Sequence, residues 1–92
     1  MGRLRAQDPE REIELPTRCL VGRAPACDLV LDGKTVSGHH AVVEWNGTAW
    51  EVQDLGSRNG TYFGDERLRA RSLIAPGTTF IVGRTSLEFT PR

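Results

Sequence analysis

AVVEWNGTAWEV, residues 41–52, is the stretch of the chain that decides the fold. Two runs rich in β-branched and aromatic residues flank the pair Asn46-Gly47, and such a pair between β-forming runs is the strongest short-range signal for a β-hairpin. Trp45 and Trp50 should lie near each other across this hairpin, and we expect both to be structural rather than ligand-binding. The stretch therefore predicts paired antiparallel strands.

Similar strand-like runs continue on both sides of the hairpin. Ten glycines and five prolines mark turns, and no stretch has the sustained i, i+3, i+4 apolar spacing of a helix. Residues 24–28 are too short for a stable helix, so a single helical turn or a loop is expected there, and residues 69–72 look polar and irregular. This pattern predicts an all-β fold, an antiparallel β-sandwich of two packed sheets. The expected strands are 4–6, 12–15, 18–21, 29–31, 42–45, 48–52, 61–63, 66–68, 78–82 and 86–89.

Length and charge limit the class of protein. The 92 residues fill one small domain, so we take 1–92 as a single domain and expect it to be one module of a longer protein. Twelve basic and twelve acidic residues give a formal net charge of zero, which argues against a broad surface for nucleic acid or an anionic membrane. No apolar run approaches the length of a membrane span, and no secretory signal is evident, so a cytoplasmic location is expected.

The cysteine and histidine content does not indicate a metal centre. Cys19 and Cys27 show no pairing pattern and would stay reduced in the cytoplasm, so both are expected to be small buried or semi-buried side chains. Together with His39 and His40 they lack the paired spacing of a tetrahedral metal site. We expect no metal and no cofactor.

Three polar turns each combine glycine with a hydrogen-bonding side chain where a strand-like run ends. Such turns let backbone and side chain both approach a small charged ligand. We expect all three at one end of a sheet. They are Gly22-Arg23, the segment 34–40 with Ser37 and His40, and the segment 56–61 with Asn59-Gly60.

The order of these motifs resembles the forkhead-associated (FHA) domain, a phosphothreonine-peptide-binding module. The matching residues run as Gly22-Arg23, Ser37-x-x-His40 and Asn59-Gly60, with Asp54-Leu55-Gly56-Ser57 before the last. The resemblance is densest over residues 21–63. It implies a β-sandwich whose ligand loops lie along one edge. It also implies a phosphothreonine-containing partner, such as a Ser/Thr kinase, a kinase substrate or the parent chain, in signalling or assembly downstream of Ser/Thr kinases.

Two of these residues suit a phosphate group. The guanidinium of Arg23 presents a planar donor fork that matches two phosphate oxygens, and the Ser37 hydroxyl can donate beside backbone N–H groups of its loop. By resemblance, Arg23 and Ser37 are the phosphate ligands. The alternatives are a solvated surface arginine and a serine that caps its own turn.

The remaining motif residues hold the peptide or the loops. Asn59 has the donor and acceptor that can hold an extended peptide backbone, the role that the resemblance gives it; its alternative is a left-handed turn residue. His40 is architectural in the family, so we expect it, with Gly22 and Gly60, to support the loops. His39 should lie near the outer surface.

The sequence departs from the family pattern at two positions. Gly38 stands where many members carry arginine or another long polar residue, so one phosphate or peptide contact is missing. Arg58 stands where members have a small hydroxyl residue, and Arg58 or Lys34 are the candidates to compensate. With Tyr62, these two are also the candidates for reading residues beside the phosphothreonine.

Two other function classes compete with a phosphopeptide reader. A hydrolytic triad of Ser37, His39 or His40, and Asp54 lacks any supporting motif, so we do not expect an enzyme. An FHA-like interaction domain that binds an unphosphorylated partner or its own parent chain is the stronger rival, and Gly38 makes it credible.

Overall fold

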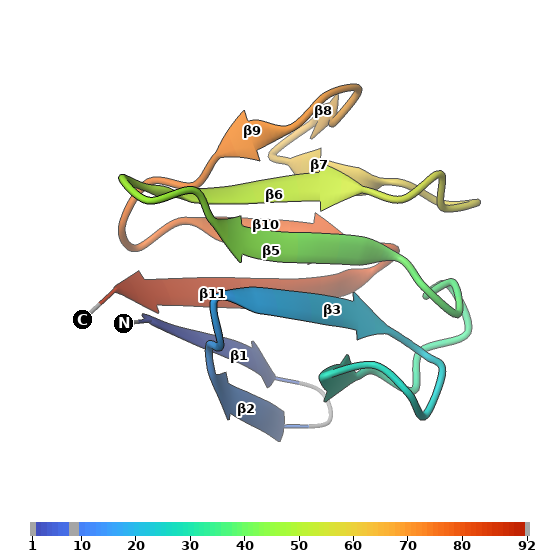
Figure 1. Ribbon diagram of the computed structural model, residues 1–92. Coiled ribbons are helices and arrows are strands. Elements are labelled where there is room, and N and C mark those ends of the chain that lie inside the picture. Colours follow the sequence, from blue (N-terminus) through green and yellow to red (C-terminus); the bar gives the residue numbers. More distant parts are fainter. Residues whose placement is uncertain (1, 8–9, 92) are drawn as a thin grey trace.

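Two sheets pack face to face in the computed structural model, which describes residues 2–7 and 10–91 (Figure 1). The expected all-β sandwich is confirmed. In sheet order, the first sheet contains β2 (Glu10–Glu14), β1 (Gly2–Gln7), β11 (Thr85–Pro91), β10 (Thr79–Val82), β7 (Thr61–Phe63) and β8 (Glu66–Arg67). The second contains β4 (Leu29–Val30), β3 (Arg18–Gly22), β5 (Ala41–Trp45), β6 (Trp50–Asp54) and β9 (Ser72–Leu73).

Alternating side chains from both sheets form the core. In β3, Cys19 and Val21 are buried while Leu20 between them is only partly so, as expected for neighbours that face opposite sides of a sheet. Trp45 and Trp50 lie across their hairpin with ring centroids 5.6 Å apart, which confirms the predicted proximity. Both cysteines are free and buried. The largest fully buried apolar side chains are Phe80, Phe89, Leu4 and Leu87.

The connection in the central hairpin is longer than predicted. Trp45 pairs with Trp50, so four residues form the loop and the expected strand start at position 48 is wrong. The cause is Asn46, whose Oδ1 accepts hydrogen bonds from the backbone N–H of Thr48 and of Ala49, each at 2.8 Å. A side chain that satisfies these donors replaces the ladder bonds of the next strand.

Two further details differ from the sequence prediction. β3 and β4 pair in parallel, with Val21 opposite Leu29, whereas the other strand pairs among the described residues are antiparallel. Ser72, which was expected in an irregular segment, begins β9, because the edge of β6 is free to pair with it. The turn predicted at 7–10 falls partly on residues 8 and 9, outside the described residues. The expected turn at 24–28 is present, with Cys27 N–H donating to Ala24 O at 3.0 Å.

The strands place several loops at one end of the sandwich. In Figure 1 the loops that follow β3, β4 and β6 lie on the right, whereas β1 begins and β11 ends on the left, where Gly2 pairs with Pro91. Within the described residues, no helix is long and apolar enough to cross a lipid bilayer.

Candidate functional site

Backbone hydrogen bonds hold the loop after β3 against the loop after β4. The N–H groups of Arg23 and Ala24 donate to the carbonyls of Ser37 and Gly38, at 3.0 and 3.1 Å. This contact requires glycine at position 22, because a Cβ there would lie 2.1 Å from the Gly38 carbonyl oxygen. The Arg23 side chain therefore leaves the backbone directly beside the Ser37 loop.

His40 joins this pair of loops to the loop after β6. Its ring is fully buried, Nδ1 accepts the Ser37 N–H at 3.0 Å, and Nε2 lies 2.8 Å from the Gly60 carbonyl oxygen. Since Ser37 N–H can only donate and Gly60 O can only accept, the ring proton must be on Nε2. His40 thus lies between the loops, where the sequence placed a supporting residue.

Ser37 and Asn59 also link the loops through their side chains. Ser37 Oγ accepts the Arg58 N–H at 3.2 Å, and Asn59 Nδ2 donates to Thr35 O at 2.9 Å. Ser37 therefore does not cap its own turn, and its hydroxyl proton is still available to a ligand. None of the described non-glycine residues has a positive φ, so the left-handed alternative for Asn59 is wrong; Gly60 takes that conformation instead, with φ of 86°.

Asp54, the last residue of β6, holds the loop that follows through hydrogen bonds to its carboxylate. Its carboxylate accepts hydrogen bonds from Ser57 N–H at 2.9 Å, Ser57 Oγ at 2.6 Å and Thr61 Oγ1 at 2.7 Å. Burial would raise the pKa of Asp54, but the bonds from Ser57 and Thr61 outweigh it and hold that pKa below its ordinary value. From the sequence, Asp54 was named as part of the segment 54–57 in the family resemblance and as a member of the rejected triad, but its role in closing the turn was not predicted, although an Asp three residues before a Ser is a spacing typical of such a side chain.

A fourth segment, the turn between β10 and β11, reaches the same loops. Gly83 N–H donates to Gly60 O at 3.0 Å, and Arg84 N–H donates to Thr35 Oγ1 at 3.0 Å. Arg84 was not predicted from the sequence, because only the pairing of β10 with β7 and β11 brings it close to Thr35. We call Arg23, residues 34–40, residues 56–60 and the turn 83–84 together the loop edge.

Four cations of the loop edge are exposed and have no acidic partner among the described residues. Gly38 lies beside them, and a Cβ at this position would meet nothing within 4 Å. A longer side chain would therefore extend into open space there. The four cations are Arg23, Lys34, Arg58 and Arg84.

The residues considered for a hydrolytic triad are not arranged as one. Backbone groups engage both ring nitrogens of His40, and its Nε2 is 3.7 Å from Asp54 Oδ1, too far for a good hydrogen bond. His39 is exposed. Among the described residues, no group of three or more His, Cys, Asp or Glu side chains could hold a metal ion.

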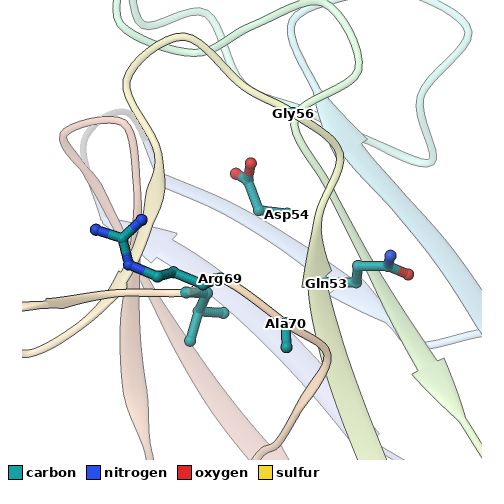
Figure 2. A pocket seen from close by; sticks show the side chains of 6 residues that line it. Gln53, Asp54, Gly56, Arg69 and Ala70 are labelled. Carbon is teal, nitrogen blue, oxygen red and sulfur yellow. The ribbon is translucent and has the colours of Figure 1, made fainter.

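A hollow of about 210 Å³ lies between the end of β6 and the segment 68–70 (Figure 2). None of Arg23, Ser37 and Asn59 lines this hollow. The lining residues are Gln53, Asp54, Gly56, Leu68, Arg69 and Ala70.

Comparison with known families identifies the domain. The sequence model of the FHA domain matches residues 19–83, which include the three loops and the strands that carry them. The chain belongs to the FHA domain family. The resemblance seen in the sequence is thereby confirmed.

This FHA domain has relatives among actinobacterial proteins. It is 38% identical over 72 residues to the FHA domain-containing protein FhaB of Mycobacterium tuberculosis, covering 78% of this chain and 46% of FhaB. It is 41% identical over 68 residues to the oxoglutarate dehydrogenase inhibitor of Corynebacterium jeikeium, covering 74% of this chain and 46% of that protein. The chain thus spans about half the length of these relatives.

Solved structures share the fold over nearly the whole chain. A structure from a study of phosphothreonine-dependent FHA domain interactions superposes with a TM-score of 0.90 at 22% identity, covering 99% of this chain and 96% of that one. M. tuberculosis EmbR, in complex with a low-affinity phosphopeptide, superposes with a TM-score of 0.88 at 30% identity, covering 97% of this chain and 24% of EmbR.

Proposed function

We propose that this FHA domain binds segments of proteins phosphorylated on threonine, in signalling or assembly downstream of Ser/Thr kinases. The observation that carries the proposal is the convergence of Arg23, Ser37 and Asn59 on loops tied to one another by hydrogen bonds. The phosphopeptide complex of EmbR, a member of the same fold at 30% identity, supports it.

Arg23 and Ser37 would hold the phosphate. The guanidinium offers two parallel N–H donors to two phosphate oxygens, and the hydroxyl of Ser37, anchored by Arg58 N–H, donates to the third. Because backbone bonds already hold these loops in place, little conformational entropy is lost when the ligand binds. Preorganised donors of this kind make binding depend on the phosphate.

Asn59 would hold the peptide backbone. Its Nδ2 is bonded to Thr35 O, which fixes the plane of the carboxamide, and no described residue donates to its Oδ1. The free oxygen can accept a peptide N–H, and the second Nδ2 hydrogen can donate to a peptide carbonyl. A threonine preference over serine would add about 1 kcal/mol from burial of one methyl group.

The domain is also proposed to work as part of a larger protein. Residues 1–92 act as one binding module of a longer cytoplasmic protein, with no catalysis, metal or cofactor of its own. The partner is a kinase, a kinase substrate or a phosphorylated part of the parent chain. The length of FhaB, of which this chain covers 46%, supports the modular part.

A peptide library with one fixed phosphothreonine, and the same library without phosphate, test the proposal on the wild type and on Arg23→Gln. We expect binding only with phosphate, and a loss of about tenfold or more in Arg23→Gln, because charge-assisted hydrogen bonds contribute about 1.5–3 kcal/mol. Arg18→Gln, an exposed arginine at the far end of β3, is the matched control and should bind like the wild type. Equal binding of both libraries would instead support a reader of unphosphorylated partners.

A further inference from the structure

Backbone hydrogen bonds hold Arg84 close to Asn59, and the side chain of Arg84 takes no part in them. Its backbone N–H donates to Thr35 Oγ1 at 3.0 Å, while Thr35 O accepts Asn59 Nδ2 at 2.9 Å. One residue, Thr35, therefore binds both the turn that carries Arg84 and the side chain proposed to hold the peptide. The side chain of Arg84 is exposed.

The turn is fixed as firmly as the loops. Gly83 donates to Gly60 O at 3.0 Å, and a Cβ on Gly83 would lie 2.5 Å from Thr35 O, so only glycine permits this approach. Gly83 has a φ of 66°, which also favours glycine. The starting point of the Arg84 side chain is thus set by the same network that sets Asn59.

The charge of Arg84 is not neutralised within the described part of the chain. Acidic residues equal basic ones in number, and Arg3, Arg5, Arg11 and Arg71 each contact a carboxylate within 3.3 Å. No described carboxylate forms an ion pair with Arg84. A cation beside a proposed peptide-binding side chain acts on an anionic group of the ligand, and such complementarity sets specificity more than affinity.

We propose that Arg84 forms a second anion subsite, which selects phosphothreonine segments that carry an acidic side chain, Asp or Glu, near the residue held by Asn59. This inference rests on the proposed function and adds a specificity determinant from the β10–β11 turn. The contact lies at an exposed surface, so its contribution is smaller than that of the phosphate.

The test walks a single Glu through the positions on both sides of the phosphothreonine in an otherwise neutral Ala/Ser peptide. For the wild type we expect one position, or two adjacent ones, to tighten binding about two- to fivefold, as expected for an exposed ion pair. Arg84→Gln should abolish this gain, so that the Glu-containing and the neutral phosphopeptides bind to this variant equally. Arg84→Glu should reverse it, so that Lys at the same position binds better than Glu.

Arg18→Gln serves again as the control, because it removes an exposed arginine at the other end of the sandwich and should keep the Glu gain. Retention of the gain in Arg84→Gln, or absence of any position that gains in the wild type, would overturn the inference while phosphate-dependent binding stands. Loss of phosphate dependence with the neutral peptide would overturn the proposed function and the inference with it. The Arg84 variants should fold normally, because the hydrogen bond that Arg84 makes in the turn comes from its backbone N–H.

Discussion

Two arginines that lie over the sheets, Arg5 and Arg71, differ in their partners from the arginines of the loop edge. Arg5 on β1 reaches Glu88 on β11 at 2.8 Å, and Arg71 beside β9 contacts Glu44, Glu51 and Gln53 on the neighbouring strands. Arg23, Arg58 and Arg84 have no acidic partner among the described residues. The same side chain thus links strands through Arg5 and Arg71, whereas these three arginines of the loop edge are left without a carboxylate from the described part of the chain. A net charge of zero conceals this division.

The largest effect is expected from removing His40, the buried residue that supports the loop edge. His40→Ala leaves the Ser37 N–H without its partner, removes one of the two hydrogen bonds to the Gly60 carbonyl and leaves a cavity where the buried ring lay, so we expect a loss of about 2–5 kcal/mol in the free energy of unfolding. Urea titration followed by tryptophan fluorescence measures it. His39→Ala, at the exposed neighbour, is the control and should change little; equal effects would contradict the supporting role of His40.

The contribution of Asp54 to the free energy of unfolding should depend on pH. Its folded-state pKa lies below the unfolded value of about 3.9, so its contribution is present above that value and is lost as pH falls through the folded pKa. We expect Asp54→Asn to lose about 1.5–3 kcal/mol near pH 6, because its hydrogen bonds would no longer go to a charged acceptor. The difference from the wild type should shrink towards pH 3. A difference independent of pH would mean that the carboxylate charge is irrelevant.

Exchanging one arginine from each region compares them directly. Arg23→Gln should weaken phosphopeptide binding by about 10- to 100-fold and leave stability nearly unchanged, because no described group depends on this guanidinium. Arg71→Gln should leave affinity unchanged. Isothermal titration with the same phosphothreonine peptide measures both variants, and a drop in affinity for Arg71→Gln would show that the regions are not independent.

The smallest expected effect comes from adding a cation to the loop edge. Gly38→Arg should fold normally, because a Cβ there meets nothing within 4 Å and the position does not have a positive φ. It should bind phosphopeptide about two- to fivefold more tightly, as one more exposed ion pair allows. Gly38→Ala is the uncharged control, and a similar gain in that variant would assign the effect to backbone stiffening instead.

Local signals made much of the fold and of the candidate site predictable. Turn residues such as Asn46-Gly47 separate the strands. The order of Arg23, Ser37 and Asn59 indicated a shared edge, because strands that alternate in direction bring such loops together. These inferences need only spacing along the chain and the residue types that turns require.

The parts that escaped prediction depend on contacts between distant segments. Arg84 meets Thr35 across 49 residues, and only the pairing of β10 with β7 and β11 fixes that approach. The parallel pairing of β4 with β3 arises because residues 23–28 bring the chain back beside Val21 and Gly22. The four-residue loop after Trp45 was missed because Asn46 uses its side chain, rather than its turn propensity, to end the ladder.

The pairing of Gly2 with Pro91 has a practical consequence for how this domain can be handled. β1 begins and β11 ends at the end of the sandwich opposite the loop edge (Figure 1). A tag, a fluorescent protein or a linker to a sensor surface can therefore be attached at either end without obstructing access to the loops. Immobilised domains should present their loops outward in a uniform orientation.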